Sequence, residues 1–182
     1  LAWFDLQRLA RVGRPQLDLA VPSPLAPRSG PTITYAPTWE GEDEANNYSS
    51  LDLYGTRIVE AALAQPDARV IYKPHPRIPQ SESPEIRRVH RRIVGLIEQA
   101  AQRDPARGHR TLIDGDVLGV IRGTDLMIAD VSSVTLDHLY LRPDAPIILC
   151  DRRTNRAQLV LDAPLAQAVH VLDADSIDTL AE

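Results

Sequence analysis

Apolar residues along this chain fall into short, β-rich runs that alternate with segments of helical spacing. The runs typical of strands cover residues 32–36, 69–73, 111–113, 125–129, 145–150 and 169–172. The segments typical of helices cover residues 51–64, 84–103, 116–122 and 132–141. Because strands and helices alternate, the pattern predicts an α/β fold with a parallel, doubly wound sheet and helices on both of its faces.

The clearest of the predicted helices spans residues 84–103. Its apolar positions recur at spacings of three and four residues: Ile86, Val89, Ile93, Ile97 and Ala100. Between them lie basic side chains: Arg87, Arg88, His90, Arg91 and Arg92. A cationic face of this kind is usually solvated, and the alternative is that it contacts an anionic partner, such as a membrane surface or a polyphosphate.

Prolines are concentrated near the start of the chain. Residues 1–19 carry apolar positions at helical spacing: Leu6, Leu9 and Val12. Residues 21–31 contain four prolines, which predicts an extended linker. We therefore place an amino-terminal helix and linker in residues 1–31 and one domain in residues 32–182. The chain starts without Met and stops within a helical pattern, so we interpret it as a piece of a larger protein.

Composition limits the class of protein. Of the 182 residues, 43% are hydrophobic, and the net charge is -5. These values suit one α/β-sized domain with a core and argue against general nucleic-acid binding. No run approaches the length of a membrane span, and nothing resembles a signal peptide. The single cysteine, Cys150, ends an apolar strand, so we expect it to be buried in a reducing, cytoplasmic compartment.

Polar residues follow three of the predicted strands at the points where these strands end. Thr38 and Trp39 follow the first strand, residues 73–77 follow the second, and residues 130–133 follow the strand that begins at Asp125. The carboxyl ends of parallel strands share one edge of a sheet, and ligands bind beyond that edge. We therefore expect the three clusters to form one site.

The sequence D-V-S-S at residues 130–133 joins a strand to a helix. The first turn of a helix has free backbone N–H groups and the positive end of the helix dipole, so Ser132 and Ser133 are placed to bind a phosphate. Asp137 follows Ser133 by about one turn and lies on the same face. The alternative is that one of the two serines is only an N-cap.

His75 lies between Pro74 and Pro76, which hold its backbone extended. Its imidazole can donate a proton or a hydrogen bond near neutral pH, while Lys73 and Arg77 favour a phosphate nearby. A lone histidine is more often structural, but the two flanking prolines after a strand favour a functional role.

The loop after the first strand combines an aromatic residue with acids. Thr38 and Trp39 can form hydrogen bonds to a ligand and one wall of its binding site. Equally, Trp39 can simply cover the edge of the sheet. Acidic residues follow them: Glu40, Glu42, Asp43 and Glu44. These acids are not spaced like the ligands of a metal ion, so we expect a solvated acidic loop, no metal and no cofactor.

Three motifs together carry a family resemblance: Y-A-P-T-W at residues 35–39, K-P-H-P at residues 73–76 and D-x-S-S-V-x-x-D at residues 130–137. With the R-P pair and the strand P-I-I-L-C-D that follow, they resemble the carboxyl-terminal domain of the CDP-glycerol glycerophosphotransferases, which build teichoic-acid-type polymers of the cell wall. The resemblance covers residues 32–151, and the ordered set is more specific than any single motif. The sequence departs from the family's pattern at Val131, where an aromatic residue is often seen.

This resemblance implies the nucleotide-donor half of a GT-B-type fold, which has two Rossmann-like halves. It implies that His75, Ser132 and Ser133 engage the donor pyrophosphate, with Asp137 in the same site. We therefore predict His75 as the catalytic residue, together with a set of donor-binding residues: Lys73, Arg77, Ser132, Ser133, Asp137, Thr38, Trp39 and Asp130.

In the implied reaction, an acceptor hydroxyl attacks the β-phosphorus of CDP-glycerol and expels CMP, whose new charge needs hydrogen-bond donors. The resemblance implies a polyol-phosphate or glycolipid acceptor, a catalytic base in a preceding domain of the same protein, and peripheral attachment at the inner face of the cell membrane. The fragment is expected to be inactive alone. His138 and Asp137 are adjacent on a helix and point in different directions, so they form a poor catalytic pair.

Two other functions remain open from the sequence. One is a GT-B glycosyltransferase with a nucleotide-sugar donor, in which Asp130 or Asp151 would bind sugar or ribose hydroxyls. The other is a non-catalytic nucleotide-binding module. The affinity for CDP-glycerol, CDP-ribitol and UDP-sugars separates these readings.

Overall fold

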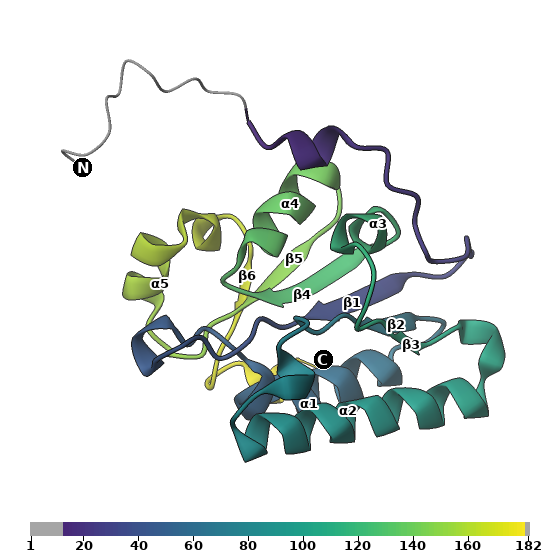
Figure 1. Cartoon of the computed structure of the whole chain (residues 1–182), viewed down its shortest axis with the longest axis horizontal. Helices are drawn as coiled ribbons and strands as arrows, with labels where there is room; N and C mark the ends of the chain where they lie inside the picture. Colours follow the sequence, from purple (N-terminus) through teal and green to yellow (C-terminus); the bar gives the residue numbers. More distant parts are fainter. Residues whose placement is uncertain (1–12, 181–182) are drawn as a thin grey trace.

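Six parallel strands form one sheet in the computed structural model, which describes residues 13–180 (Figure 1). The strands are β1 (Thr32–Ala36), β2 (Arg69–Tyr72), β3 (Arg110–Thr111), β4 (Leu126–Asp130), β5 (Ile147–Cys150) and β6 (His170–Leu172). Their order across the sheet is β3-β2-β1-β4-β5-β6. The predicted Rossmann-like α/β fold is confirmed. The direction of winding reverses between β1 and β4, which is where sheets of this kind bind ligands.

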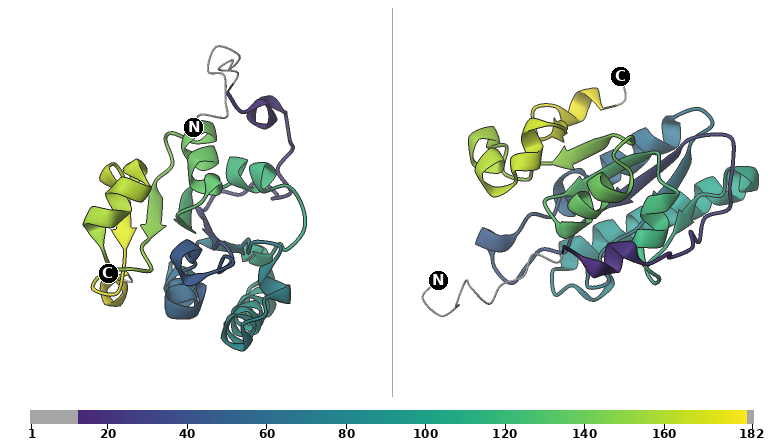
Figure 2. Two further views of the ribbon diagram at one scale, coloured as in Figure 1. Left: turned by 60° about the vertical axis from the view of Figure 1, so that its left-hand side comes forward. Right: turned by 90° about the horizontal axis from the view of Figure 1, so that it is seen from above.

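Helices cover both faces of the sheet (Figures 1 and 2). One face carries α1 (Leu51–Ala64) and α2 (Pro84–Arg103). The other face carries α3 (Val117–Arg122), α4 (Ser133–Leu141) and α5 (Arg156–Asp162). Short 3-10 helices lie in the connections: η2 (Pro15–Asp18), η3 (Glu44–Asn46), η4 (Ile78–Gln80), η5 (Pro105–Arg107), η6 (Pro164–Gln167) and η7 (Ile177–Thr179). None of the helices within residues 13–180 combines the length and apolarity that a membrane crossing requires.

The helix α2 begins and buries its side chains largely as its sequence predicts. Ser83 Oγ accepts a hydrogen bond from the backbone N–H of Ile86 (3.4 Å), so Ser83 is the N-cap. The apolar stripe is buried: Ile86, Val89, Ile93 and Ile97. His90, which we predicted on the cationic face, is buried with this stripe, and its Nδ1 lies 3.1 Å from the Tyr72 hydroxyl. That prediction was wrong because His90 lies three residues before Ile93 and so shares the apolar face.

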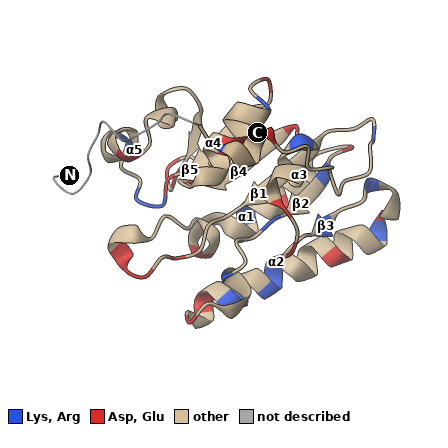
Figure 3. Cartoon of the chain, turned by 45° about the horizontal axis from the view of Figure 1, so that its top comes forward, with Lys and Arg blue, Asp and Glu red and all other residues tan. Residues whose placement is uncertain are grey.

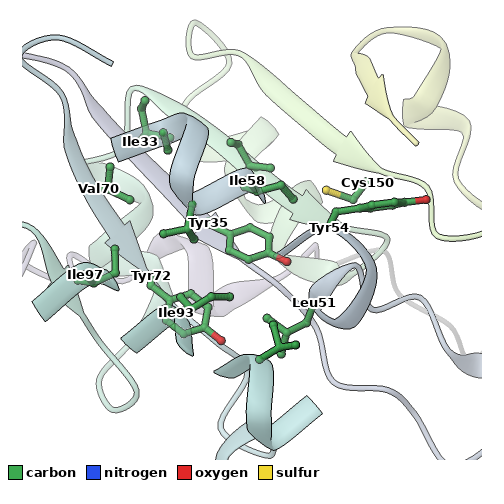
Figure 4. Packing of buried hydrophobic residues seen from close by; sticks show 14 of the residues in the cluster. Ile33, Tyr35, Leu51, Tyr54, Ile58, Val70, Tyr72, Ile93, Ile97 and Cys150 are labelled. Carbon is green, nitrogen blue, oxygen red and sulfur yellow. The ribbon is translucent and has the colours of Figure 1, made fainter. Parts of the chain in front are cut away.

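Two stacked tyrosines form the centre of the core between the sheet and the pair α1 and α2 (Figure 4). The ring centroids of Tyr35 on β1 and Tyr72 on β2 are 5.9 Å apart. The Tyr35 hydroxyl lies 2.8 Å from Ser50 Oγ, so both buried polar atoms have a partner. This hydrogen bond ties the start of α1 to the strand that leads into the predicted site.

The helix α5 was not predicted from the sequence. It buries a single residue, Leu159, so it lacks the apolar stripe that marks α2. Its start carries a local signal, because Asn155 Oδ1 accepts a hydrogen bond from the backbone N–H of Gln158 (3.1 Å). An N-cap alone was too weak to assign the helix.

The proline-rich segment runs past α3 to the start of β1 (Figure 1). Leu25 is buried in a cluster with Ile71 of β2 and Val120 of α3. The helix predicted over residues 1–19 falls largely outside the described residues, and the described part of it contains η2. The segment thus contributes to the core, and the domain boundary at residue 31 stays a prediction.

Gly119 on α3 shows how closely this segment packs. A Cβ atom at Gly119 would lie 2.6 Å from the carbonyl oxygen of Pro22, so we expect Gly119→Ala to lower the free energy of unfolding by about 1–3 kcal/mol. Gly95→Ala on α2 is the matched control, since, apart from its chain neighbours and the backbone of its own helix, no described atom lies within 4 Å of its Cβ position. Alanine should stabilise α2 there by about 0.5–1 kcal/mol. Urea denaturation measures both effects, and wild-type stability of the Gly119 variant would contradict this packing.

Candidate functional site

A cavity of about 440 Å³ lies beyond the carboxyl ends of β1, β2 and β4. Its walls are residues 36–38, 73–76 and 131–134, together with Gly115 and Val117. The expectation that the three polar clusters share one edge is confirmed for these members: Thr38, Lys73, His75, Ser132 and Ser133. The cavity therefore sits at the point where the winding of the sheet reverses.

Ser132 is the N-cap residue of α4, with an extended backbone (φ -157°, ψ 170°). Its hydroxyl makes no capping hydrogen bond, and its Oγ is buried without a partner among the described residues. Ser133, the first helical residue, is exposed. The side chain of Ser132 therefore does not act as a cap, and the N–H groups of the first turn are available to an anion in the cavity.

His75 is held by hydrogen bonds to its backbone and to its ring. Its backbone N–H donates to the Pro37 carbonyl (3.1 Å), and its Nδ1 accepts the backbone N–H of Arg77 (3.2 Å). A neutral imidazole with Nδ1 as acceptor carries its proton on Nε2. Burial, followed by the charges of Arg77 and Lys73, lowers the pKa of His75 below 6.5, so the ring is neutral at pH 7 and Nε2–H is a donor.

Lys73 adds a positive charge to the same wall. It is buried, and its Nζ donates a hydrogen bond to the carbonyl of Ile113 (2.8 Å). Burial lowers the pKa of Lys73, while Asp114 and Asp116 act in the opposite direction. Its ammonium group is thus bonded to the loop after β3. The positive charge of this group acts on the cavity electrostatically.

The family model described as CDP-glycerol:poly(glycerophosphate) glycerophosphotransferase matches residues 13–152. The chain belongs to this family. The match includes the strands from β1 to β5 and all of the residues that line the cavity. No curated protein matches the chain. Because the family is one of transferases, the match supports a glycerophosphotransferase-type activity.

Trp39 and Arg77 lie against His75 and do not line the cavity. The rings of Trp39 and His75 are stacked, with centroids 6.2 Å apart and an interplanar angle of 30°. The guanidinium carbon of Arg77 lies 4.2 Å from the centroid of the Trp39 ring, a cation–π contact. In this glycerophosphotransferase-family chain the two side chains orient and shield His75, and their contact with a donor stays a prediction.

The carboxylates of Asp130 and Asp151 accept hydrogen bonds from backbone N–H groups. Asp130 is completely buried and accepts hydrogen bonds from the N–H groups of Thr38 (2.7 Å) and Ser50 (3.1 Å). Asp151 accepts them from Arg153 (3.0 Å) and Asn155 (2.9 Å). Neither residue lines the cavity. The structure therefore does not bring the carboxylate of Asp130 to the predicted donor site.

Asp137 and His138 are buried in α4, away from the cavity wall. Asp137 is 2% exposed and lies 2.6 Å from the guanidinium of Arg14, and burial raises its pKa. His138 Nε2 lies 3.4 Å from the carbonyl oxygen of Ala145. The ion pair with Arg14 fastens the segment before the linker to α4, so the structure gives Asp137 a contact other than the predicted donor.

The acidic loop after β1 is only partly solvated. Glu42, Asp43 and Glu44 are exposed, as predicted. Glu40 departs from the prediction, because one carboxylate oxygen pairs with the Ser81 hydroxyl and the other is buried. The local sequence pattern did not indicate this contact, because Ser81 lies far along the chain, in the connection between β2 and α2. Among residues 13–180, no group of three His, Cys, Asp or Glu side chains is arranged to hold a metal ion.

The loop between β3 and α3 was missed as part of the site. It supplies Gly115 to the cavity wall, and Val117, the first residue of α3, also lines this wall. Gly115 has a positive φ of 90°, which favours glycine, and Asp116 caps α3 by accepting the backbone N–H of Leu118 (2.8 Å). The sequence D-G-D after a short strand is a signal that points to this turn.

Proposed function

We propose that this chain is the donor-binding half of a glycerophosphotransferase and that its cavity holds the pyrophosphate of CDP-glycerol. The observation that carries the proposal is that two kinds of hydrogen-bond donor line one cavity. They are the backbone N–H groups in the first turn of α4 and the Nε2–H of His75. Both suit negative charge on phosphate oxygens. Thr38 and Lys73 complete the wall on the side of β1 and β2.

In the proposed reaction, the oxygen of an acceptor hydroxyl attacks the β-phosphorus of CDP-glycerol. The bond between this phosphorus and the bridging oxygen breaks, and its electron pair leaves with CMP. The N–H groups of α4 and the Nε2–H of His75 stabilise the charge that develops on the CMP phosphate. The hydroxyl proton passes to a base, which we assign to an amino-terminal half of the same protein.

A nucleotide-sugar transferase would share this phosphate chemistry. It would use a carboxylate for the sugar or ribose hydroxyls, and the sequence offers Asp130 and Asp151 for that role. Each of these carboxylates already accepts two backbone hydrogen bonds. Their engagement favours a polyol-phosphate donor over a sugar donor.

Calorimetry with CDP-glycerol, CDP-ribitol and UDP-glucose tests the proposal on the whole chain. We expect CDP-glycerol to bind, and Ser132→Ala and Ser133→Ala each to weaken binding by about 1 kcal/mol or somewhat more. Ser83→Ala is the matched control, because Ser83 caps α2 and does not line the cavity. This control should lose stability and keep its affinity. Preference for UDP-glucose favours the sugar transferase, and the absence of binding to all three donors contradicts a donor site.

We also propose that the enzyme acts at the inner face of the cell membrane, on a polyol-phosphate or glycolipid acceptor in cell-wall polymer synthesis. Basic and acidic residues are interspersed along α2 (Figure 3). Arg88 pairs with Glu85 and Arg92 pairs with Glu60, whereas Arg91 is exposed without an acidic partner in the described part of the chain. The basic side chains of this helix are the proposed contact with anionic lipid.

Co-sedimentation with anionic vesicles tests this contact. Binding should fade as the salt concentration rises, because exposed charges are screened. It should also fall in the double variant Arg87→Glu with Arg91→Glu, since each basic residue near such a surface contributes about 1 kcal/mol. A chain that stays in the supernatant at low and high salt leaves α2 as a solvated face.

A further inference from the structure

Asp130 is the last residue of β4, and its carboxylate connects two distant backbone segments. Oδ2 accepts a hydrogen bond from the Thr38 N–H (2.7 Å), and Oδ1 accepts one from the Ser50 N–H (3.1 Å). Thr38 lies in the loop after β1, and Ser50 is the N-cap of α1. One buried side chain thus joins β4, the loop after β1 and the start of α1.

The backbone of Thr38 is held at both its N–H and its carbonyl group. Its N–H donates to Asp130, and its carbonyl accepts a hydrogen bond from Ser49 Oγ (2.9 Å). Thr38 lines the cavity, and so does Ser132, two residues after Asp130. A change at Asp130 therefore reaches two walls of the cavity, although Asp130 itself does not line it.

The start of α1 is a second helix N-terminus at this edge of the sheet. Unbonded N–H groups at such a position attract phosphate. Here the N–H of Ser50 donates to Asp130, and the N–H of Leu51 donates to Ser49 Oγ (3.3 Å). Side chains of the protein therefore accept two of the N–H groups at the start of α1, those of Ser50 and Leu51. At α4, by contrast, the Ser132 hydroxyl has no partner within the described residues.

We propose that Asp130 is a positioning residue, which fixes the Thr38 wall of the cavity and favours binding of the donor's phosphates at α4 by accepting the Ser50 N–H at the start of α1. This inference rests on the proposed donor site and deepens it. It replaces the direct donor contact that the sequence suggested for Asp130. The physical reason is that both oxygens of this enclosed carboxylate are bonded to the protein.

Asp130→Asn tests the inference, because an amide can accept only one of the two hydrogen bonds. Asp151→Asn is the matched control, since Asp151 is also buried at the end of a strand and also accepts two backbone hydrogen bonds, but in a loop that does not line the cavity. On the whole chain at pH 8, where the Asp130 side chain is ionised, calorimetry should give about 10-fold weaker CDP-glycerol binding for Asp130→Asn, as expected for a displaced binding group. The control should change it by no more than about twofold.

Amide hydrogen exchange gives a second readout that does not depend on the donor. Protection of the Thr38 and Ser50 N–H groups should be lost in Asp130→Asn and kept in Asp151→Asn. If Asp130→Asn fails to fold, Ser49→Ala loosens the Thr38 peptide from its carbonyl side and should also weaken donor binding.

The outcomes separate this inference from the proposed function. Wild-type affinity in Asp130→Asn or, if that variant does not fold, in Ser49→Ala overturns the inference while the donor site stands. Failure of the wild-type chain to bind CDP-glycerol counts against the proposed function. In that case, the exchange of the Thr38 amide still decides whether Asp130 holds the cavity wall.

Discussion

Replacing His75 with alanine is expected to lower the turnover of the full-length enzyme by roughly 10²- to 10⁴-fold. The Nδ1 atom of His75 accepts the Arg77 N–H, which leaves the Nε2–H free to act as the proposed hydrogen-bond donor to the leaving phosphate. Alanine removes this donor, and because His75 is only partly buried, the loss of stability should be small by comparison. Initial rates with CDP-glycerol and a polyol-phosphate acceptor, together with thermal denaturation, measure the two effects.

His170→Ala is the matched control for this experiment, because His170 is exposed on β6 and does not line the cavity. It should keep wild-type turnover. The lowered pKa of His75 adds a second expectation. Its contribution to turnover should stay constant between pH 7 and pH 8, because the neutral ring keeps its Nε2–H over this range. A His75 variant that turns over as fast as the His170 variant would assign the ring a structural role.

The stability of the wild-type chain relative to Asp130→Asn is expected to fall as the pH rises from 5 to 8. Burial raises the pKa of Asp130 from 3.8 to about 7, against the opposing effect of its hydrogen bonds from Ser50 and Thr38. The folded state therefore keeps a proton that the unfolded chain loses near pH 4. The stability linked to this proton is complete below the unfolded pKa and is lost as the pH rises through the folded pKa.

Urea denaturation of the two proteins at several pH values measures this effect. At about 1.4 kcal/mol for each pKa unit, the difference in unfolding free energy should move by roughly 3 kcal/mol in favour of Asp130→Asn between pH 5 and pH 8. The other titrating groups are shared by the two proteins, so their contributions largely cancel. A difference that does not vary with pH would mean that Asp130 is already ionised at pH 5.

Much of the fold was predictable because its elements carry strong local patterns. The predicted bounds of β1, α1 and α2 agree with the structure. Central parallel strands are buried on both faces and appear as short apolar runs, and α2 carries a long apolar stripe with a Ser-Pro start. The helix α5 lacked such a stripe and was missed for that reason.

The candidate site was predictable to the extent that it follows from strand ends. His75, Ser132 and Ser133 were selected because parallel strands place their carboxyl ends at one edge, and the cavity brings these residues together. Gly115 and Val117 were missed, because the strand before them, β3, has only two residues and its sequence pattern is weak. The family motifs specified phosphate chemistry but not the contacts of each side chain.

By itself, the sequence determined the alternation of strands and helices, the edge on which the polar clusters meet, and the start of the helix α4 at that edge. Only the tertiary structure decided which polar groups at that edge face the cavity and which form hydrogen bonds within the protein. Asp130 and Thr38 are 92 positions apart, and Asp130 and Ser50 are 80 apart. Their hydrogen bonds depend on how β4, β1 and α1 pack, and a local pattern of residues carries no information about partners at that distance.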